Sequence, residues 1–502
     1  MRILLAGIPE ILDQPLRQSL SSNHVLMSPS GDIRDLATCH AVADCDLVIH
    51  GIPDSESDLD RLDHASRGTW NVLTTTGAKR YILLSTMRLF DAYGEGWHVT
   101  ESWSPRPTTD VAQLAPYLAE VASREISRTR PIECFALRLD NVVTAEVFHG
   151  GEVDPIWLTV DDAINAIIRG TEIESLSTDG SRWVPLHIVR GDQSSRFPIG
   201  QAGTAPFDLS VRHRVTNEPP PAPASVPVPP RSPGPIRDLP APTNVVMFGS
   251  GGPLGAITAT ELIGKYRLRL TDYRSLADIA ASPPQSEGAP LPTPVIAPDE
   301  ERLVDVTDPI AVRDAVRGMD AVVNCTVMRH DPIQAFRVNT LGAFNVMRAV
   351  VDEGIRRVVH TGPVLTLAPH PAGYSDDRDV ASNAPPRPGD NLYFVSKLLG
   401  QEICRIFAEE HDIACPTLLF CGFIDPGSSE RNHETPGAFS ISWRDSATAM
   451  EAALRVEHLP VPFQVFHILT DAPHDRYTNL EAKQLLGWEP VDRLDHLWRR
   501  KY

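Results

Sequence analysis

The sequence predicts an α/β protein in which two doubly wound parallel sheets follow one another in tandem, joined by a proline-rich linker. Short apolar runs alternate with helical patterns along both halves of the 502-residue chain. Segments of the first half reappear in the same order in the second half. A stretch between the halves, 219–242, contains 11 prolines. The chain is also too long for a single hydrophobic core.

The proline-rich stretch sets the domain boundaries. Proline lacks the amide hydrogen and fixes φ, so this stretch cannot form a helix or a central strand. We expect an extended, semi-rigid spacer. The chain therefore divides into a first domain at 1–205, a linker at 206–243 and a second domain at 244–502.

Four segments of the first half resemble segments of the second half. Their offset stays near 274 and rises to 283 at the last pair. Four matches in one order at a nearly constant offset indicate a tandem duplication. The pairs are 42–53 with 316–327, 68–86 with 342–362, 117–125 with 393–402, and 160–167 with 443–450.

The second half alternates strand-like and helix-like segments. Helical patterns such as 343–354 and 397–412 separate its apolar runs. This alternation is typical of βαβ units and predicts a parallel, doubly wound sheet. Strands are predicted at 245–249, 268–272, 302–306, 321–325, 357–362, 416–421 and 463–468.

A glycine-rich turn follows the first of these strands. Gly249, Gly252 and Gly255 form the pattern GxxGxxG. The first glycine permits a tight turn, the second lets the backbone approach a pyrophosphate, and the third lets the helix pack closely. Pro253 and Leu254 open that helix, whose N-terminal amides and dipole favour phosphate. The turn therefore predicts a dinucleotide site, although such turns are also merely structural.

An acidic residue, Asp272, ends the next predicted strand, 23 residues after Gly249. A carboxylate there can accept hydrogen bonds from the adenosine ribose, which favours NAD over NADP. Tyr273 and Arg274 follow it, and a guanidinium there could pair with the 2′-phosphate of NADP. We expect NAD, with NADP as the alternative cofactor and a solvated strand end as the alternative role of Asp272.

Tyr393 and Lys397 lie four residues apart on a predicted helix and therefore share one face. A free phenol has a pKa near 10 and is a poor base at neutral pH, but a nearby ammonium lowers that pKa. We expect Tyr393 to exchange a proton with a substrate hydroxyl or carbonyl while hydride moves to or from nicotinamide. The alternative is a surface pair.

With these motifs, residues 244–502 resemble the extended short-chain dehydrogenase/reductase superfamily, in its NAD-dependent epimerase/dehydratase branch. The resemblance implies a Rossmann-type domain with a small C-terminal substrate region, bound NAD(P) and a sugar, sugar acid or nucleotide-sugar substrate. The internal repeat extends the Rossmann-type fold to the first half, which gives two such domains in tandem. The spacing of 387–397 and 439–446 is also similar to uronate dehydrogenases. The resemblance adds five cofactor-site residues: Asp305 and Val306 beside the adenine, Cys325 and Thr326 along the cofactor, and Asn339, which supports the lysine.

The chain departs from the family at one catalytic position. Pro363 stands where the family carries a Ser or Thr, and proline has no hydroxyl. Thr361 or Thr366 could substitute, and Thr361 is the third catalytic candidate. We expect an NAD(P)-dependent oxidoreductase or epimerase/dehydratase; the alternative is a non-catalytic NAD(P)-binding sensor or scaffold.

The first half lacks most of the cofactor-site and catalytic residues that the second half contains. It keeps Gly7 but has no other glycine over 8–14, and only 25 residues separate Gly7 from Asp32, against 56 in the second half. The missing segment would hold the strand that reads the ribose. Tyr117 remains, but the lysine position is Val121. We interpret this half as a pseudo-domain and scaffold; the alternative is a second site with different chemistry. Apolar strands are nevertheless kept at 3–7, 46–52, 80–86 and 134–139.

Composition limits the partners. A formal net charge of −19 argues against nucleic acid and against anionic membranes. The seven cysteines form no CxxC pair and the 17 histidines show no metal-ligand spacing, so we expect free thiols, no metal and a cytoplasmic location. No apolar run reaches the length of a membrane span, and the start of the chain is typical of a strand rather than a signal peptide.

Two expectations concern assembly and substrate. The two halves are expected to pack as a pseudo-dimer within one chain, which a flexible linker would favour by effective concentration; further homo-oligomers are compatible with this. Substrate contacts are expected from the loops 368–391 and 425–440. Arg431, His433 and Arg444 are candidates for binding an anionic substrate.

Overall fold

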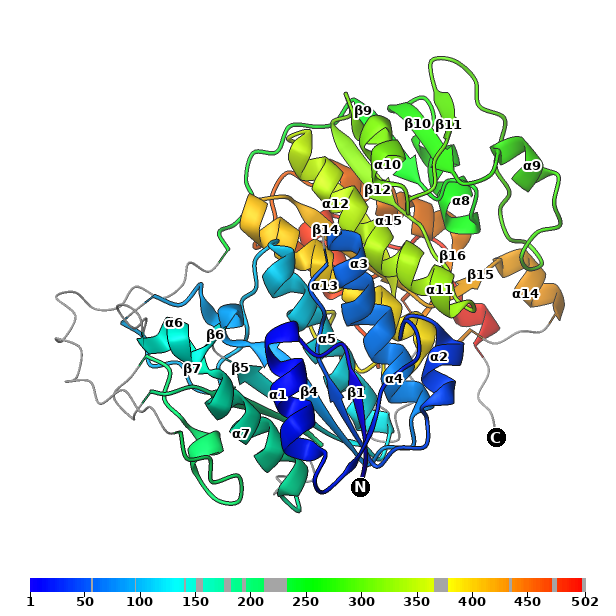
Figure 1. Cartoon of the computed structure of the whole chain (residues 1–502). Coiled ribbons are helices and arrows are strands. Elements are labelled where there is room, and N and C mark those ends of the chain that lie inside the picture. The colour runs from blue at the N-terminus through cyan, green and yellow to red at the C-terminus, as the bar shows by residue number, and fades with distance from the viewer. Residues whose placement is uncertain are drawn as a thin grey trace. The chain divides into compact units, whose positions relative to one another are not determined.

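The chain forms two compact units, Met1–Ser232 and Pro233–Tyr502. A computed structural model describes residues 1–498 apart from 56, 95, 140, 150–156, 176–181, 192–195, 212–232, 365–377, 433–435 and 472–475. Each unit contains one large parallel sheet with helices on both faces (Figure 1). The predicted α/β fold with two parallel sheets is thus confirmed.

The predicted linker is too wide at both ends. Phe207 and Leu209 are buried in the core of the first unit, because their apolar side chains pack there rather than facing water. Ile236 and Leu239 are buried in the core of the second unit, and Ile236 pairs with Leu459 in an antiparallel bridge. The part at 212–232 lies outside the described residues, so a semi-rigid spacer there stays a prediction.

The sheet of the second unit has the order β11-β10-β9-β12-β13-β14-β17, and every neighbouring pair is parallel. All seven predicted strands are present. The order reverses between β9 and β12, and open parallel sheets bind ligands at the carboxyl ends of the strands at such a reversal. The strands are β9 (Asn244–Phe248), β10 (Arg267–Asp272), β11 (Glu300–Leu303), β12 (Ala321–Asn324), β13 (Val358–Pro363), β14 (Cys415–Phe420) and β17 (Phe463–His467).

The helices of the second unit cover the two faces of this sheet (Figure 1). On one face α8 packs against α15, and apolar side chains such as Met247, Leu262 and Met450 fill the core between them and the strands. On the other face α10, α12 and α13 pack in succession. Their bounds are α8 (Pro253–Leu262), α10 (Pro309–Val316), α12 (Gly342–Asp352), α13 (Leu392–His411) and α15 (Trp443–Arg455).

Shorter elements complete the second unit. A π-helical segment, Phe336–Leu341, runs into α12, and β15 and β16 form a separate parallel pair. These shorter elements are α9 (Leu276–Ala280), α11 (Pro332–Ala335), α14 (Pro426–Asn432), β15 (Gly422–Ile424) and β16 (Ser440–Ser442).

The first unit repeats this plan with one strand fewer. Its sheet has the order β2-β1-β3-β4-β5-β8, and all pairs are parallel. Helix α1 packs against α7, whereas α5 packs against α3 and α4 (Figure 1). The strands are β1 (Arg2–Ala6), β2 (Val25–Met27), β3 (Leu47–His50), β4 (Arg80–Thr86), β5 (Glu133–Leu139), β6 (Asn141–Val143), β7 (Trp157–Thr159) and β8 (Trp183–Ile188), and the helices are α1 (Glu10–Leu20), α2 (Leu36–Ala41), α3 (Asp58–Asp63), α4 (Thr69–Thr75), α5 (Val111–Thr129), α6 (Ala145–His149) and α7 (Val160–Glu172).

The missing strand is not the one that the sequence led us to expect. The short strand β2 lies beside β1, in the place that β10 takes beside β9, so the ribose-reading position is occupied. Among its described residues, the first unit has no counterpart of the outer strand β11. By register Met27 corresponds to Arg269, which puts Ser30 rather than an acid where the second unit has Asp272.

The two units also share individual contacts. Asn71 donates from its side-chain amide to the carbonyl of Ile33, 3.0 Å away, and Asn345 donates to the carbonyl of Val306, 2.8 Å away. Arg80 and Arg357 both donate to carbonyls just after the equivalent helices α7 and α15. These shared contacts favour a tandem duplication, which itself stays a prediction from the sequence.

Arg357 is expected to be a main contributor to the stability of the second unit. Its side chain is 2% exposed and donates to the carbonyls of Leu454, Val456 and Pro240. Hydrogen bonds from a charged group contribute about 1.5–3 kcal/mol each, and the buried carbonyls would lose their donor. We expect Arg357→Met to lower the free energy of unfolding by about 3 kcal/mol in urea titrations. The exposed neighbour is the control: Arg356→Met should change it by less than about 0.5 kcal/mol, and equal effects would contradict the assignment.

Candidate active site

The turn after β9 requires glycine at two of the three predicted positions. Gly249 has φ +76°, and a Cβ there would lie 2.9 Å from the backbone of Cys325 and Thr326. A Cβ on Gly255 would lie 2.1 Å from the Gly249 carbonyl oxygen. Side chains at these positions would push the turn away from β12 and α8 away from the turn. The two glycines therefore fix the backbone of the site.

Gly252 has a different role, because the space in front of it is open. It precedes α8, and a Cβ there would meet nothing closer than the Gly249 carbonyl oxygen at 3.7 Å. The first turn of α8 begins with Pro253 and Leu254, both uncharged, and proline at this position removes an amide that would lack a partner. A helix N-terminus that is uncharged and open in front fits a pyrophosphate.

Asp272 lies at the end of β10 and is 8% exposed. One carboxylate oxygen accepts from the Gly251 amide and the other from the Tyr273 amide, both at 2.9 Å. Burial raises the pKa of this carboxyl group, and the backbone hydrogen bonds act against that shift. Gly251, which the sequence analysis did not single out, thus ties the carboxylate to the turn. The Arg274 side chain is exposed and donates to the Ser282 hydroxyl at 3.2 Å.

Asp305 and Val306 follow β11. Asp305 is exposed and accepts from the Thr307 amide at 2.9 Å. Val306 is buried, and its side chain would be 2.9 Å from a Cβ on Gly342. The predicted strand included both residues, whereas β11 ends at Leu303. Their contact with an adenine stays a prediction.

Asn339 joins the loop after β12 to α13. Its amide nitrogen donates to the Met328 carbonyl at 2.7 Å and to the Ser396 hydroxyl at 2.9 Å, while its oxygen accepts from the Met328 amide at 3.0 Å. Ser396 precedes Lys397 on α13. Asn339 therefore supports the lysine through its neighbour and through the loop rather than by direct contact.

Lys397 is buried against the same loop. Its ammonium nitrogen donates to the Thr326 carbonyl at 3.3 Å, and the Thr326 hydroxyl donates to the Asn324 side chain at 2.7 Å. Burial lowers the pKa of Lys397 to about 8, so the ammonium form still dominates at neutral pH. Burial also raises the pKa of the nearby Cys325 to about 12, so that residue is a neutral thiol.

Tyr393 is half-buried at the second position of α13, and its pKa differs from the expectation. Burial raises the pKa of Tyr393, and the cation that opposes this shift is Arg329, by charge and by a hydrogen bond. The Arg329 guanidinium lies 5.2 Å from the centre of the Tyr393 ring. The expected lowering of this pKa by Lys397 stays a prediction. Sequence reasoning missed Arg329, whose only signal was a basic residue after the fourth predicted strand.

Of the predicted catalytic groups, the hydroxyl has the least support from the structure. The Thr361 hydroxyl is buried and donates to the Asn324 carbonyl at 2.9 Å, inside the sheet. Pro363 ends β13 and offers no donor, and Thr366 lies outside the described residues. Of the anion-binding candidates, Arg444 is exposed and donates to Asp492 at 3.4 Å. His433 and the side chain of Arg431 lie outside the described part of the chain.

The turn of the first unit is unfavourable for binding a phosphate. Gly7 has φ +61°, and a Cβ there would lie 2.3 Å from the Gly51 carbonyl oxygen. The backbone conformation and packing of the turn therefore suffice to explain this glycine. Pro9 precedes α1, and the first turn of α1 contains the acidic residues Glu10 and Asp13. Acidic side chains at a helix N-terminus compete with a phosphate for the positive end of the dipole.

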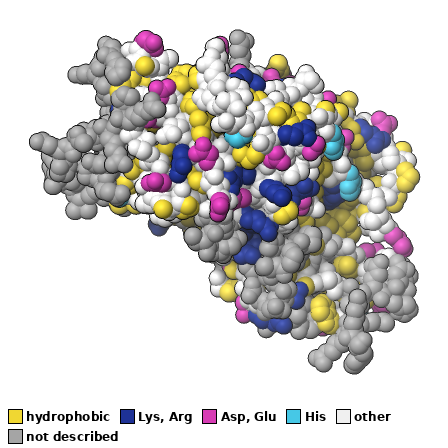
Figure 2. Space-filling model, turned by 60° about the horizontal axis from the view of Figure 1, so that its bottom comes forward, with side chains coloured by type: hydrophobic (Ala, Val, Ile, Leu, Met, Phe, Trp, Pro, Cys, Tyr) yellow, Lys and Arg dark blue, Asp and Glu magenta, His cyan; other side chains and the backbone are white. Residues whose placement is uncertain are grey.

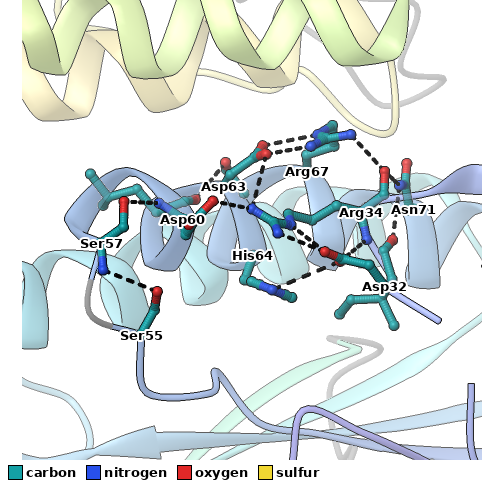
Figure 3. A network of polar contacts seen from close by, with 12 residues as sticks. Asp32, Arg34, Ser55, Ser57, Asp60, Asp63, His64, Arg67 and Asn71 are labelled. Carbon is teal, nitrogen blue, oxygen red and sulfur yellow. Dashed lines mark hydrogen bonds and ion pairs between the residues drawn. The ribbon is translucent and has the colours of Figure 1, made fainter. Parts of the chain in front are cut away.

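The place that corresponds to Asp305 in the first unit is filled by paired charges (Figure 3). The Arg34 guanidinium donates to Asp32 at 2.8 Å and to Asp60 at 2.5 Å. Arg67 pairs with Asp63, which is buried, and donates to the Arg34 carbonyl at 2.6 Å. These side chains satisfy one another, as expected for a structural network rather than an adenine site.

The predicted correspondence of Tyr117 with Tyr393 also fails. Asp110 precedes α5 and Asn391 precedes α13, each accepting a hydrogen bond from the first turn. Counted from these residues, the second position of α5 is Ala112, whereas Tyr117 lies more than a turn further along. The first unit thus has neither the tyrosine nor the lysine at the positions that the second unit uses.

The strand order of the second unit and its glycine turn are those of a Rossmann-type α/β fold. Residues 245–452 match the model of the NAD dependent epimerase/dehydratase family, and this match supports NAD as the cofactor. An NAD-dependent glucose-6-phosphate dehydrogenase of Haloferax volcanii is 25% identical over 262 residues, which cover 49% of this chain and 93% of the relative. An L-arabinose 1-dehydrogenase (NAD(P)(+)) of the same organism is 25% identical over 221 residues, which cover 40% and 87%. A solved uronate dehydrogenase from Agrobacterium tumefaciens is 21% identical with a TM-score of 0.40, covering 51% of this chain and 86% of that one.

Surface properties carry less information about function. On the face drawn in Figure 2, acidic, basic and apolar side chains are interspersed rather than gathered by kind. No helix within the described ranges is long and apolar enough to cross a membrane. Among the described residues, no group of histidine, cysteine and acidic side chains has the arrangement of a metal site.

Proposed function

We propose that the second unit is an NAD-dependent oxidoreductase that acts on a hydroxyl of a sugar or sugar acid. The observation that carries this proposal is the placement of Tyr393 and Lys397 at the start of α13, with Lys397 bonded to the loop after β12. That loop follows the strand at which the sheet order reverses. The open turn at Gly252 follows the adjacent strand, so both features belong to one edge of the sheet.

The residues present fit NAD. The open backbone at Gly252 and the first turn of α8 would hold the pyrophosphate, and Asp272 would accept from the adenosine ribose. Both oxygens of Asp272 already accept one backbone amide each, which leaves lone pairs for the ribose hydroxyls. The exposed Arg274 keeps NADP as the alternative cofactor.

The chain's own residues would move the proton. When bound, NAD supplies the acceptor or donor of hydride. The phenolate of Tyr393 would take the proton of the substrate hydroxyl as the carbonyl forms, and the phenol would return it in the reverse direction. Lys397, an ammonium at neutral pH, would hold positive charge beside the site.

Two curated relatives favour a dehydrogenase over an epimerase, since both are named as sugar dehydrogenases. The test is to mix the purified full chain with NAD and a panel of aldoses, sugar phosphates and sugar acids, and to follow NADH absorbance. A dehydrogenase gives net NADH, whereas an epimerase or dehydratase gives a changed sugar without net NADH. The sensor alternative, which Pro363 favours, predicts NAD binding without turnover of any substrate.

For the first unit we propose a scaffold role without NAD. Glu10 at the N-terminus of α1 and the filled charge network around Asp32 support it. Packing of the two halves as a pseudo-dimer, and any further oligomer, stay predictions from the sequence. Cross-linking with mass spectrometry tests that packing: links between the helices 69–75 and 342–352 are the expected result.

A further inference from the structure

Arg329 lies against the ring of Tyr393. It belongs to the loop after β12, and its side chain is exposed to solvent. Its guanidinium carbon is 5.2 Å from the centre of the Tyr393 ring, within the range of cation–π contacts. Tyr393 is itself half-buried, so both side chains can reach a substrate that approaches from solvent.

The other donors near the site each have at least one partner other than Tyr393. The ammonium of Lys397 donates to the Thr326 carbonyl, and the hydroxyls of Thr326 and Thr361 both donate to Asn324. Pro363 has no side-chain donor. Among the residues that the structure describes, Arg329 is thus the cation that directly faces the phenol of Tyr393.

One side chain holds both partners in place. Asn339 bonds the amide and the carbonyl of Met328, the residue before Arg329, at 3.0 and 2.7 Å. The same amide group donates to Ser396, which lies on α13 between Tyr393 and Lys397, at 2.9 Å. Asn339 is buried, so the loop that carries Arg329 is fixed to the helix that carries Tyr393.

We infer that Arg329 is a positioning residue that stabilises the phenolate of Tyr393, the role that the sequence assigned to Lys397. The inference rests on the proposed function of Tyr393 as the proton acceptor. A cation at this distance favours the charged form of a tyrosine, and Arg329 therefore increases the fraction of base at a given pH. The other titratable group that acts on the phenol is Cys421, whose thiol pKa is raised by burial. On its own helix, Lys397 lies one turn away, and the remaining titratable side chains of α13 begin at Glu402, more than two turns further along.

The first test is independent of catalysis. Tyrosinate absorbance is titrated against pH in the full chain and in Arg329→Met, each corrected by its own Tyr393→Phe variant. The ionisation of Tyr393 should move up by roughly one pH unit or more in Arg329→Met, and Arg329→Lys should restore part of the shift. The exposed Arg337 provides the control, since Arg337→Met should leave the titration unchanged. Identical titrations with methionine and with arginine at position 329 would overturn the inference.

The second test uses turnover. Arg329→Met should shift the rising limb of kcat/KM to higher pH by the same interval and lower kcat at neutral pH by about 10-fold, with KM little changed. A rise in KM limited to anionic sugars, with the limb unmoved, would show that Arg329 binds substrate instead and would overturn the inference. If no substrate is turned over, the proposed function fails, while the absorbance titration still decides the role of Arg329.

Discussion

Tyr393→Phe should lower kcat for sugar oxidation by about 10²–10⁴-fold, the range that a positioned acid/base group contributes. Phenylalanine keeps the ring that contacts Arg329 and Phe394 but removes the oxygen that would accept the proton. Affinity for NAD should change by less than about two-fold, because the glycine turn and Asp272 are untouched. Steady-state kinetics with a sugar substrate, and calorimetric titration with NAD, measure the two quantities.

The pH dependence gives the same variant a second signature. Burial raises the pKa of Tyr393, so the phenolate is scarce at neutral pH and becomes more abundant as the pH rises. Sugar oxidation should therefore accelerate with increasing pH, and Tyr393→Phe should abolish this dependence along with most of the rate. Tyr117→Phe is the matched control in the first unit and should leave the rate and its pH dependence unchanged. A Tyr393→Phe variant with normal turnover would refute the role assigned to the phenol.

Gly252→Val should weaken NAD binding by about 100-fold, or about 2.8 kcal/mol, without unfolding the second unit. A side chain there has room within the protein, since its nearest contact would be a carbonyl oxygen at 3.7 Å. The backbone at Gly252 has φ −70° and ψ 158°, which valine adopts readily. The added methyl groups would therefore fill the open space in front of α8, where the pyrophosphate is proposed to lie.

Two control variants separate binding from folding. Gly77→Val in the first unit would place a Cβ at the same distance, 3.7 Å, from the Ala43 carbonyl, and should change neither NAD affinity nor the free energy of unfolding. Gly255→Val should destabilise the second unit, because a Cβ there would lie 2.1 Å from the Gly249 carbonyl. Unchanged NAD affinity in Gly252→Val would place the pyrophosphate elsewhere.

The parts of the fold that the sequence predicts well depend on local rules. The strands of the second unit are short apolar runs between helical patterns, and a buried parallel strand requires such a run. Gly249 and Gly255 could be predicted because a positive φ and a close backbone approach each exclude a side chain, whatever the rest of the structure does. The pair Tyr393 and Lys397 could be found because four residues span about one helical turn.

The parts that the sequence does not predict depend on contacts between distant segments. Arg329 lies 64 residues before Tyr393 in the chain, and only the loop conformation held by Asn339 brings it to the ring. Tyr117 was matched to Tyr393 by local sequence similarity. The position of a side chain along the helix is instead set by the start of α5 at Val111. The strand β2 has only three residues and was too short to recognise.

The functional division between the two units depends on a comparison of their turns. At α8 the first turn is uncharged and the space before Gly252 is open, whereas α1 follows Pro9 and begins with Glu10. The same element of the same fold is thus suited to a phosphate in one unit and opposed to it in the other. Duplication of the fold does not imply duplication of the site.

Native mass spectrometry of the full chain titrated with NAD tests this division most directly. One NAD should bind per chain, and Gly252→Val should bind none at the same concentration while Gly77→Val still binds one. Two bound NAD per chain, or one that persists in Gly252→Val, would contradict the assignment of the cofactor to the second unit alone.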